Sequence, residues 1–240
     1  MKRLFTFLCV AVFCFCAVSD VRAQENGDGQ DEQTAQAEAD RKMEEDLYKK
    51  ILDASLLQEK VLNYQVRKYG VDSVETIKPM EALAWMYMEL GNYNEAEVLY
   101  RKVLQLRGEK VAPSEENTKY TGIAYFMLGE VNFLRDRYIL AEDNYDRAMQ
   151  LALDPEARGD ALDRKGKIYK SIGNYEKALS FYLMAVEEYK SAKSSPKIDT
   201  RLMSAYASLV EVYKGLGLRL KAKEYQDLID TMNKEESERK

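Results

Sequence analysis

The chain has 240 residues, a formal net charge of −5, three cysteines and no histidine. A mildly acidic chain is a poor candidate for binding nucleic acid or an anionic membrane surface. A chain without histidine lacks the commonest metal ligand and acid–base group. Composition therefore argues against a nucleic-acid-binding protein, a metalloprotein and most classes of enzyme, and we predict neither a metal nor another cofactor.

The first 23 residues are typical of a secretory signal. Lys2 and Arg3 precede an apolar run over 4–18, which is short for a membrane span, and Val21-Arg22-Ala23 ends it like a signal-peptidase site. We expect cleavage after Ala23, export to the periplasm or the medium, and no membrane span afterwards. Two alternatives stay open, an uncleaved N-terminal anchor and a lipoprotein attached through one of the cysteines, Cys9, Cys14 or Cys16.

The next segment is polar and acidic. Residues 24 to about 40 carry no large apolar side chain, so we predict a disordered acidic leader over 24–43. From Leu47 onward apolar residues return at helical spacing, and no alternating strand pattern is present. We predict an all-α domain over 44–232 and a solvated tail over 233–240.

The clearest helical pair lies within Met80–Leu106. Apolar residues recur at i, i+3, i+4 and i+7 from Met80. Gly91 is expected to end the first helix in a left-handed cap, and Asn94 to cap the second with Glu97 as the acid of a capping box. The short connection makes the helices antiparallel, and their remaining apolar flanks require neighbours.

The turn of this pair recurs along the chain. Each copy ends on an alanine that opens the same apolar pattern, and the last copy is degenerate; the copies are Gly91–Ala96, Asp136–Ala141, Gly173–Ala178 and Gly217–Ala222. A recurring helical pair predicts a solenoid, because each pair buries its second flank only against the next.

These segments resemble the tetratricopeptide repeat over about residues 44–232. The family places small residues where paired helices cross; the matching residues are Ala84, Gly129 and Gly166 on first helices and Ala96, Ala141, Ala178 and Ala222 on second helices. The intervals exceed the basic unit of about 34 residues and are similar to the kinesin light chain type. The resemblance implies a right-handed α-α superhelix of about nine helices, namely four pairs and a leading helix over about 44–69.

In this family the inner groove, lined by first helices, commonly binds peptides. The groove positions of the family correspond here to Trp85, Met88, Phe126, Phe133, Lys167, Lys170 and Lys214. We expect an apolar floor toward the N-terminal half and a basic patch formed by the three lysines. The alternative is that the rings pack as core. The lysine and asparagine clamp of chaperone-binding members is not matched, because Trp85, Glu130 and Lys167 stand at the corresponding positions.

We therefore predict a protein without catalytic residues that acts as an interaction scaffold. It would bind a protein or peptide partner of the cell envelope, or of the secreted fraction, in the groove of the solenoid. The alternative is a structural subunit of a larger envelope complex, held through its convex face or its ends. The sequence leaves the partner's identity and the oligomeric state open.

Overall fold

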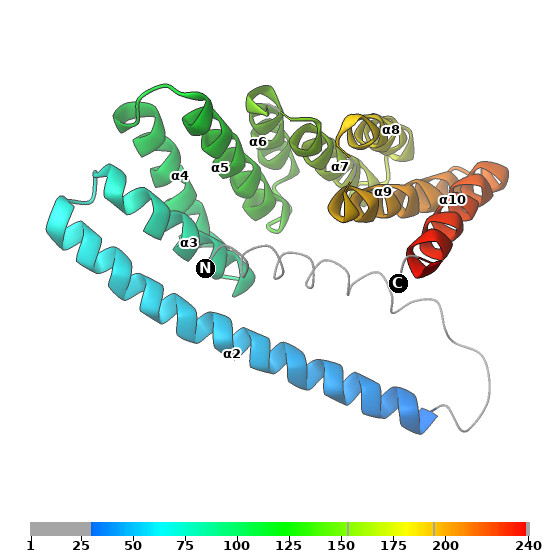
Figure 1. The fold of residues 1–240 in the computed structure, drawn as a ribbon, viewed down its shortest axis with the longest axis horizontal. Coiled ribbons are helices and arrows are strands. Elements are labelled where there is room, and N and C mark those ends of the chain that lie inside the picture. The colour runs from blue at the N-terminus through cyan, green and yellow to red at the C-terminus, as the bar shows by residue number, and fades with distance from the viewer. Residues whose placement is uncertain (1–29, 153, 194, 239–240) are drawn as a thin grey trace. The chain divides into compact units, whose positions relative to one another are not determined.

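The computed structural model describes residues 30–152, 154–193 and 195–238. Nearly all of these residues are helical, and the described ranges contain no β-strand. The chain divides into two compact units, Met1–Lys49 and Lys50–Lys240. The second unit holds all the helical pairs (Figure 1). The predicted all-α class is thereby confirmed.

Nine α-helices and one 3₁₀ helix follow one another in the described part of the chain. The helix α2, Gln30–Tyr69, crosses the boundary between the units, and η2, Val74–Thr76, connects it to the first pair. The four pairs are α3 (Ile77–Glu89) with α4 (Tyr93–Lys110), α5 (Glu115–Phe133) with α6 (Tyr138–Leu151), α7 (Pro155–Ser171) with α8 (Tyr175–Ser191), and α9 (Pro196–Gly215) with α10 (Arg219–Glu238). We call the members of each pair its first and second helix. The predicted four pairs and one leading helix are confirmed.

Each pair turns through a residue with a left-handed backbone. The φ angles are +77°, +76° and +74° at Gly91, Gly173 and Gly217, and +56° at Asp136. At the first turn Asn92 N donates to Tyr87 O at 2.8 Å and Gly91 N donates to Met88 O at 3.1 Å. These two bonds satisfy carbonyl groups at the end of the first helix, and the predicted role of Gly91 is confirmed.

The start of the second helix differs from the prediction. Asn92 takes the N-cap position of α4, and its side chain makes no cap hydrogen bond. The predicted capping box of Asn94 and Glu97 is therefore wrong. Glu97 pairs instead with Arg101 of its own helix and with Arg135, which follows α5. Charge-assisted bonds to two guanidinium groups are stronger than one bond to an exposed backbone N–H.

Small residues lie where the paired helices cross, as predicted. Ala84 is fully buried. A Cβ added to Gly129 would lie 2.5 Å from Cε1 of Tyr145, and one added to Gly166 would lie 2.7 Å from Cε1 of Tyr182. The tyrosine of each second helix thus fills the space that the missing side chain leaves, which brings the two helices close together.

The leader before the first pair differs from the prediction. A disordered segment was expected over 24–43, but α2 has begun by Gln30. Residues 30–42 contain no large apolar side chain, yet they are rich in alanine, glutamine and glutamate and contain no glycine or proline. High helix propensity therefore favours the helix where hydrophobicity gives no signal. Residues 1–29, with the expected signal over 1–23, lie outside the described residues.

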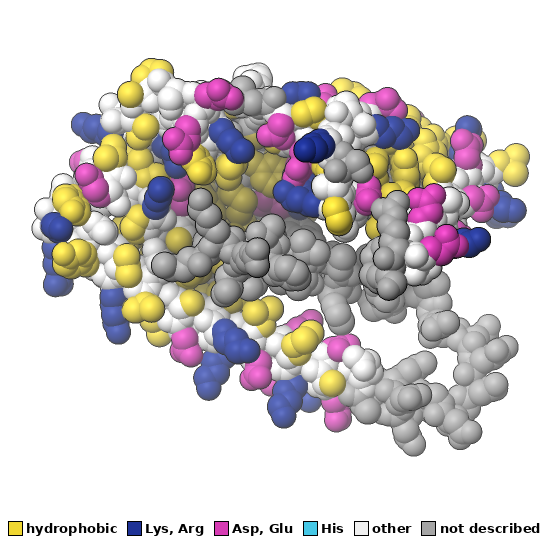
Figure 2. All heavy atoms as spheres, in the orientation of Figure 1, with side chains coloured by type: hydrophobic (Ala, Val, Ile, Leu, Met, Phe, Trp, Pro, Cys, Tyr) yellow, Lys and Arg dark blue, Asp and Glu magenta, His cyan; other side chains and the backbone are white. Residues whose placement is uncertain are grey.

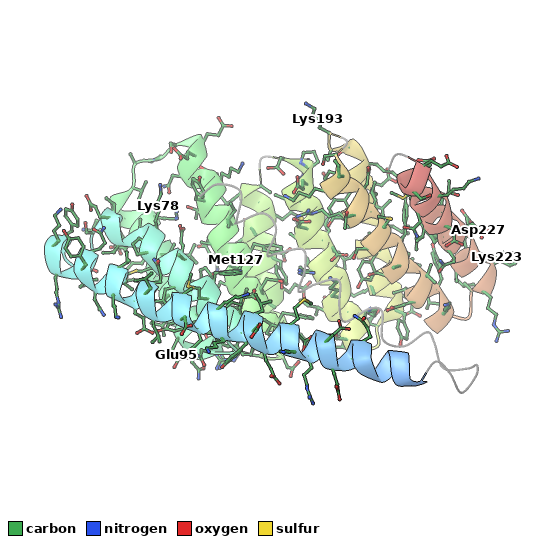
Figure 3. All side chains as sticks on the ribbon, turned by 60° about the horizontal axis from the view of Figure 1, so that its bottom comes forward. Lys78, Glu95, Met127, Lys193, Lys223 and Asp227 are labelled. Atoms are coloured by element: carbon green, nitrogen blue, oxygen red, sulfur yellow. The ribbon has the colours of Figure 1, made fainter. Side chains whose placement is uncertain are left out.

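The last helix also continues further than the predicted boundary at 232. α10 runs to Glu238, and the described side chains over 233–238 are exposed. Figure 3 shows the exposed Lys223 and Asp227 on the side of α10 that faces away from α9. A terminal helix has no successor to cover it, so a polar outer side is expected.

The core of the second unit is a series of clusters between neighbouring helices. From α3 to α10, each helix packs on the helices before and after it in the chain. Contacts also join first helices of adjacent pairs, α3 with α5 and α7 with α9. First helices therefore lie next to one another along one face of the stack, which we call the first-helix face.

Candidate partner-binding face

The seven predicted partner-binding residues all lie on first helices. Trp85 and Met88 are on α3, Phe126 and Phe133 on α5, Lys167 and Lys170 on α7, and Lys214 on α9. Within each helix the two residues are three or seven positions apart, which places both on one side. The structure thus places all seven residues on first helices, in chain order along the stack.

The apolar end of this face is partly core. Met88 is 8% exposed and packs with Ala84, Tyr100 and Leu128 in one cluster. Trp85 is half-buried beside the same cluster. Met88 therefore offers a partner little surface. Trp85 keeps part of its side chain at the face.

The two phenylalanines are half-buried and held by tyrosines of the second helix. The ring centroids of Phe126 and Tyr145 are 5.5 Å apart at an interplanar angle of 53°, and those of Phe133 and Tyr138 are 5.8 Å apart at 50°. Tilted aromatic pairs at these distances attract each other. The two phenylalanine rings are therefore held in place by side chains of the protein itself.

The predicted basic patch also contains acidic side chains. Lys170 Nζ lies 2.6 Å from Glu211 Oε2, and Lys167 Nζ lies 3.2 Å from Asp163 Oδ2. Lys214 is exposed. Figure 2 shows the same mixing over the rest of the visible surface, where acidic and basic side chains are interspersed. Two of the three lysines are thus paired with carboxylates on the face itself.

A cluster of charged side chains lies at the centre of the face. We call Glu130, Tyr145, Asp163, Arg164 and Lys167 the central ion cluster. Arg164 Nε donates to Glu130 Oε1 at 2.8 Å, and the Tyr145 hydroxyl donates to the same carboxylate oxygen. Asp163 Oδ2 forms ion pairs with Arg164 Nη1 at 3.5 Å and with Lys167 Nζ. The cluster joins α5, α6 and α7 and balances two cations against two carboxylates.

Burial and neighbouring charge act against each other in this cluster. Burial disfavours the charged form of Arg164, but the carboxylates of Glu130 and Asp163 outweigh it and raise the pKa of the guanidinium. Burial, reinforced by Glu130, raises the pKa of the Tyr145 hydroxyl. At Lys167 burial outweighs Asp163 and lowers the pKa of the amine. The cluster therefore keeps Arg164 charged and lowers the pH at which the Lys167 amine loses its proton.

On sequence alone, Glu130 and Lys167 were compared with the clamp positions of the family, but the cluster that they form with Asp163 and Arg164 was not identified. A signal was present in the repeat alignment. Glu130 and Lys167 occupy the same position of successive repeats, and opposite charges at one repeat position favour pairing between neighbouring first helices. Arg164, adjacent to Asp163 in the chain, is the residue that makes the connection.

A second set of polar contacts joins α7, α8 and α9. Arg201 binds Asp160 through two contacts, Nε to Oδ1 at 2.5 Å and Nη2 to Oδ2 at 2.8 Å. The hydroxyl group of the buried Tyr189 of α8 donates a hydrogen bond to Asp160 Oδ1 at 2.9 Å. One carboxylate thus fixes the third pair to the fourth. Such bidentate contacts give geometric specificity to the packing.

A cleft of about 470 Å³ lies at the N-terminal end of the second unit. It is lined by side chains of α2, α3 and α4, namely Glu59, Leu62, Asn63, Leu83, Tyr87, Asn94, Glu95, Val98 and Leu99. The Tyr87 hydroxyl donates to Glu59 Oε1 at 2.7 Å. Burial and this carboxylate raise the pKa of Tyr87 to about 12, so the hydroxyl keeps its proton and the contact that joins α2 to α3.

In the described ranges, no group of three or more histidine, cysteine, aspartate or glutamate side chains could hold a metal ion. None of the described helices combines the length and the hydrophobicity that a membrane span needs.

The stacked antiparallel pairs and their glycine turns define an α-hairpin repeat protein. Residues 80–112 and residues 120–191 each match a family model described as a tetratricopeptide repeat. The chain therefore carries tetratricopeptide repeats in these segments. Proteins built from this repeat are generally interaction scaffolds without catalytic activity.

Solved structures share the architecture. A Podosopora anserina putative kinesin light chain with nearly identical TPR-like repeats is 15% identical with a TM-score of 0.64, over 89% of this chain and 100% of that chain. A crystal structure of MamA is 23% identical with a TM-score of 0.56, over 78% of this chain and 91% of that chain. At these identities the similarity concerns the fold alone.

Curated relatives match over shorter shares of their own length. Outer dynein arm-docking complex subunit 4 of Mus musculus is 20% identical over 187 residues, which are 75% of this chain and 30% of that protein. Photosystem I assembly protein Ycf3 of Cuscuta gronovii is 34% identical over 92 residues, which are 38% of this chain and 49% of that protein. The matched part is thus less than half of each of these relatives.

Proposed function

We propose that this chain is an exported, non-catalytic scaffold that holds a segment of an envelope or secreted protein on its first-helix face. The observation that carries the proposal is the ordered row of first helices α3, α5, α7 and α9, in a fold whose members bind other proteins. Export rests on the sequence of residues 1–23, with its basic start, apolar run and small residue at Ala23.

The chemistry of the face indicates what kind of segment would fit. Toward the N-terminal pairs it offers the half-buried rings of Trp85, Phe126 and Phe133 and the exposed side chain of Leu134. Aromatic side chains held in place contribute most of the binding energy in many interfaces. The partner segment would place apolar side chains here.

Toward the C-terminal pairs the face is polar and of mixed charge. Lys170 and Glu211 already form an ion pair, and Lys214 is exposed beside it along α9. A partner segment would therefore meet both signs of charge, and a strongly acidic segment gains no advantage. Mixed charge favours specificity and register more than raw affinity.

Recovery of partners from the envelope fraction tests the face. The variant Leu134→Glu puts a charge among the aromatic residues without opening the core, because Leu134 is exposed. The matched control is Ile139→Glu, on the second helix α6, which is also exposed. The same helical content of both variants by circular dichroism shows that they are folded.

We expect wild type and Ile139→Glu to recover the same partners and Leu134→Glu to lose them. Trp85→Ala combined with Phe126→Ala should give the same loss. Equal recovery by all variants refutes binding at this face, and a permanent high-mass complex in every variant supports the structural-subunit alternative. N-terminal sequencing tests export: Gln24 at the start supports it, whereas an intact Met1 contradicts cleavage.

A further inference from the structure

The helix α2 has the pattern of a second helix without a first helix of its own. Ala54, Leu57, Gln58 and Val61 have the spacing of Ala96, Leu99, Tyr100 and Val103 in α4. In α4 the alanine, the tyrosine and the valine of this set are buried, because α3 and α5 cover them. In α2 the equivalent valine, Val61, is 39% exposed, and Leu57 is 64% exposed.

The adjacent side of α2 does pack on the first pair. Gln58 Nε2 donates to Pro79 O at 3.2 Å, Glu59 accepts from the Tyr87 hydroxyl, and Leu62 packs on the cluster around α3. The later part of α2 is therefore held on the next repeat, as a second helix should be. The uncovered side is the one that a preceding first helix would occupy.

The uncovered side forms a continuous apolar stripe. Ala54, Leu57, Val61 and Tyr64 are spaced by three, four and three residues, which is the seam spacing of a coiled coil. Leu57 and Tyr64 are both more than half exposed, at 64% and 59%. We call these four residues the open α2 face. Apolar side chains that line up along an exposed helix mark an interaction site.

Charged residues beside the open α2 face repeat every seven positions. They are Asp46, Asp53, Lys60 and Arg67, two acidic residues followed by two basic ones. When two such helices run antiparallel, these flanking positions meet the same flanking positions of the other helix. Asp53 then meets the partner's Lys60, and Asp46 meets the partner's Arg67. Parallel pairing would set Asp53 and Lys60 against glutamines instead.

We propose that the open α2 face binds a second copy of this chain, with the two α2 helices antiparallel. In the register that the flanking charges set, Ala54 lies opposite Leu57 of the second copy, Tyr64 opposite Leu47, and Val61 opposite the aliphatic stem of Lys50. The flanking charges are complementary only in this direction, and a two-fold axis repeats each pair. The proposal concerns a different surface from the first-helix face and does not depend on it.

The test measures the mass of the full chain, with its native N-terminus, by sedimentation equilibrium over a range of protein concentrations. We expect a reversible equilibrium between monomer and dimer. The variant Leu57→Glu/Val61→Glu should be monomeric at every concentration and keep its helical content. The control is Leu52→Glu/Leu56→Glu, on another side of the same helix, which is also exposed and should dimerise like wild type.

Charge reversal tests the direction of pairing. Asp53→Lys and Lys60→Asp should each weaken the dimer about tenfold, because the two-fold axis doubles the loss of a surface ion pair and adds repulsion. The two substitutions together restore opposite charges and should recover the wild-type dissociation constant. If the double variant dimerises no more tightly than the single variants, the antiparallel register is refuted.

Two further results would overturn the proposal. The first is a wild-type chain that stays monomeric at all concentrations. This result counts against the proposal even if the open α2 face is needed to bind a different protein. The second is a dimer that Leu57→Glu/Val61→Glu leaves unchanged, because the dimer would then use another surface.

Discussion

The contact between Gly129 and Tyr145 gives the sharpest test of how the pairs are held together. Alanine at an ordinary helical glycine stabilises a protein, by about 0.8–1 kcal/mol at an interior helix position. At Gly129 the added Cβ would lie 2.5 Å from Cε1 and 2.7 Å from Cδ1 of Tyr145. These separations are about 1 Å shorter than a favourable carbon–carbon contact.

The tyrosine ring has little freedom to move away. Its hydroxyl binds Glu130, its ring forms a tilted pair with Phe126, and the side chain is fully buried. Relief therefore requires α5 and α6 to separate, and overpacking of this kind costs about 1–3 kcal/mol. We expect Gly129→Ala to lower the free energy of unfolding by about 1–2 kcal/mol after the gain in helix propensity.

Gly108 provides the matched control. It lies in α4, is exposed, and has nothing within 4 Å of an added Cβ. Gly108→Ala should raise the free energy of unfolding by up to about 0.8 kcal/mol. Urea denaturation followed by circular dichroism measures both variants, and their melting temperatures should differ by about 4–8 °C. A Gly129→Ala protein at least as stable as Gly108→Ala refutes the close-crossing argument.

Three further variants test the polar contacts. Arg164→Met leaves the carboxylates of the central ion cluster without their main cation and should destabilise the chain by about 3–5 kcal/mol. The control Arg101→Ala removes an exposed ion pair and should change stability by less than about 1 kcal/mol. Similar melting temperatures of the two variants would contradict this contrast. Lys167→Met should be more stable than wild type at neutral pH, because burial lowers the pKa of the amine. Folded wild type then binds fewer protons than the unfolded chain, so its free energy of unfolding rises with pH up to about 10.5, the ordinary pKa of a lysine amine. The stability advantage of the variant should therefore shrink as the pH rises. An advantage that stays constant or grows with pH refutes this expected pH dependence. Tyr189→Phe should lower the free energy of unfolding by only about 1 kcal/mol, because Arg201 still binds the carboxylate of Asp160. A loss close to that of Arg164→Met, measured by chemical denaturation, would refute this expectation.

Much of the fold could be predicted because its signals are local. A glycine in the turn, as at Gly91, and small residues at the crossing, as at Ala84, are each required by the backbone itself. The same reasoning failed where hydrophobicity gives no signal. The start of α2 at Gln30 depends on helix propensity, which a search for apolar spacing does not weigh.

The candidate site was harder to predict because its contacts join different repeats. Lys170 and Lys167 look like a basic patch on one helix, but Glu211 and Asp163 neutralise them. The first of these pairs crosses from α7 to α9, so no spacing within one helix reveals it. Sequence spacing places a side chain on a face, whereas the net charge of that face depends on which neighbour lies opposite.

The linear stacking of the helical pairs determines how the protein unfolds. In the described part of the chain, the helices from α3 to α10 pack mainly on their neighbours in the sequence, so the stack behaves as a line of modules rather than as a single globule. Opening should begin at the two ends and travel inward, with amide protons in α6 and α7 exchanging last. A protease that removes α10 should leave a shorter but still ordered row, so the length of the scaffold could be trimmed without erasing its architecture.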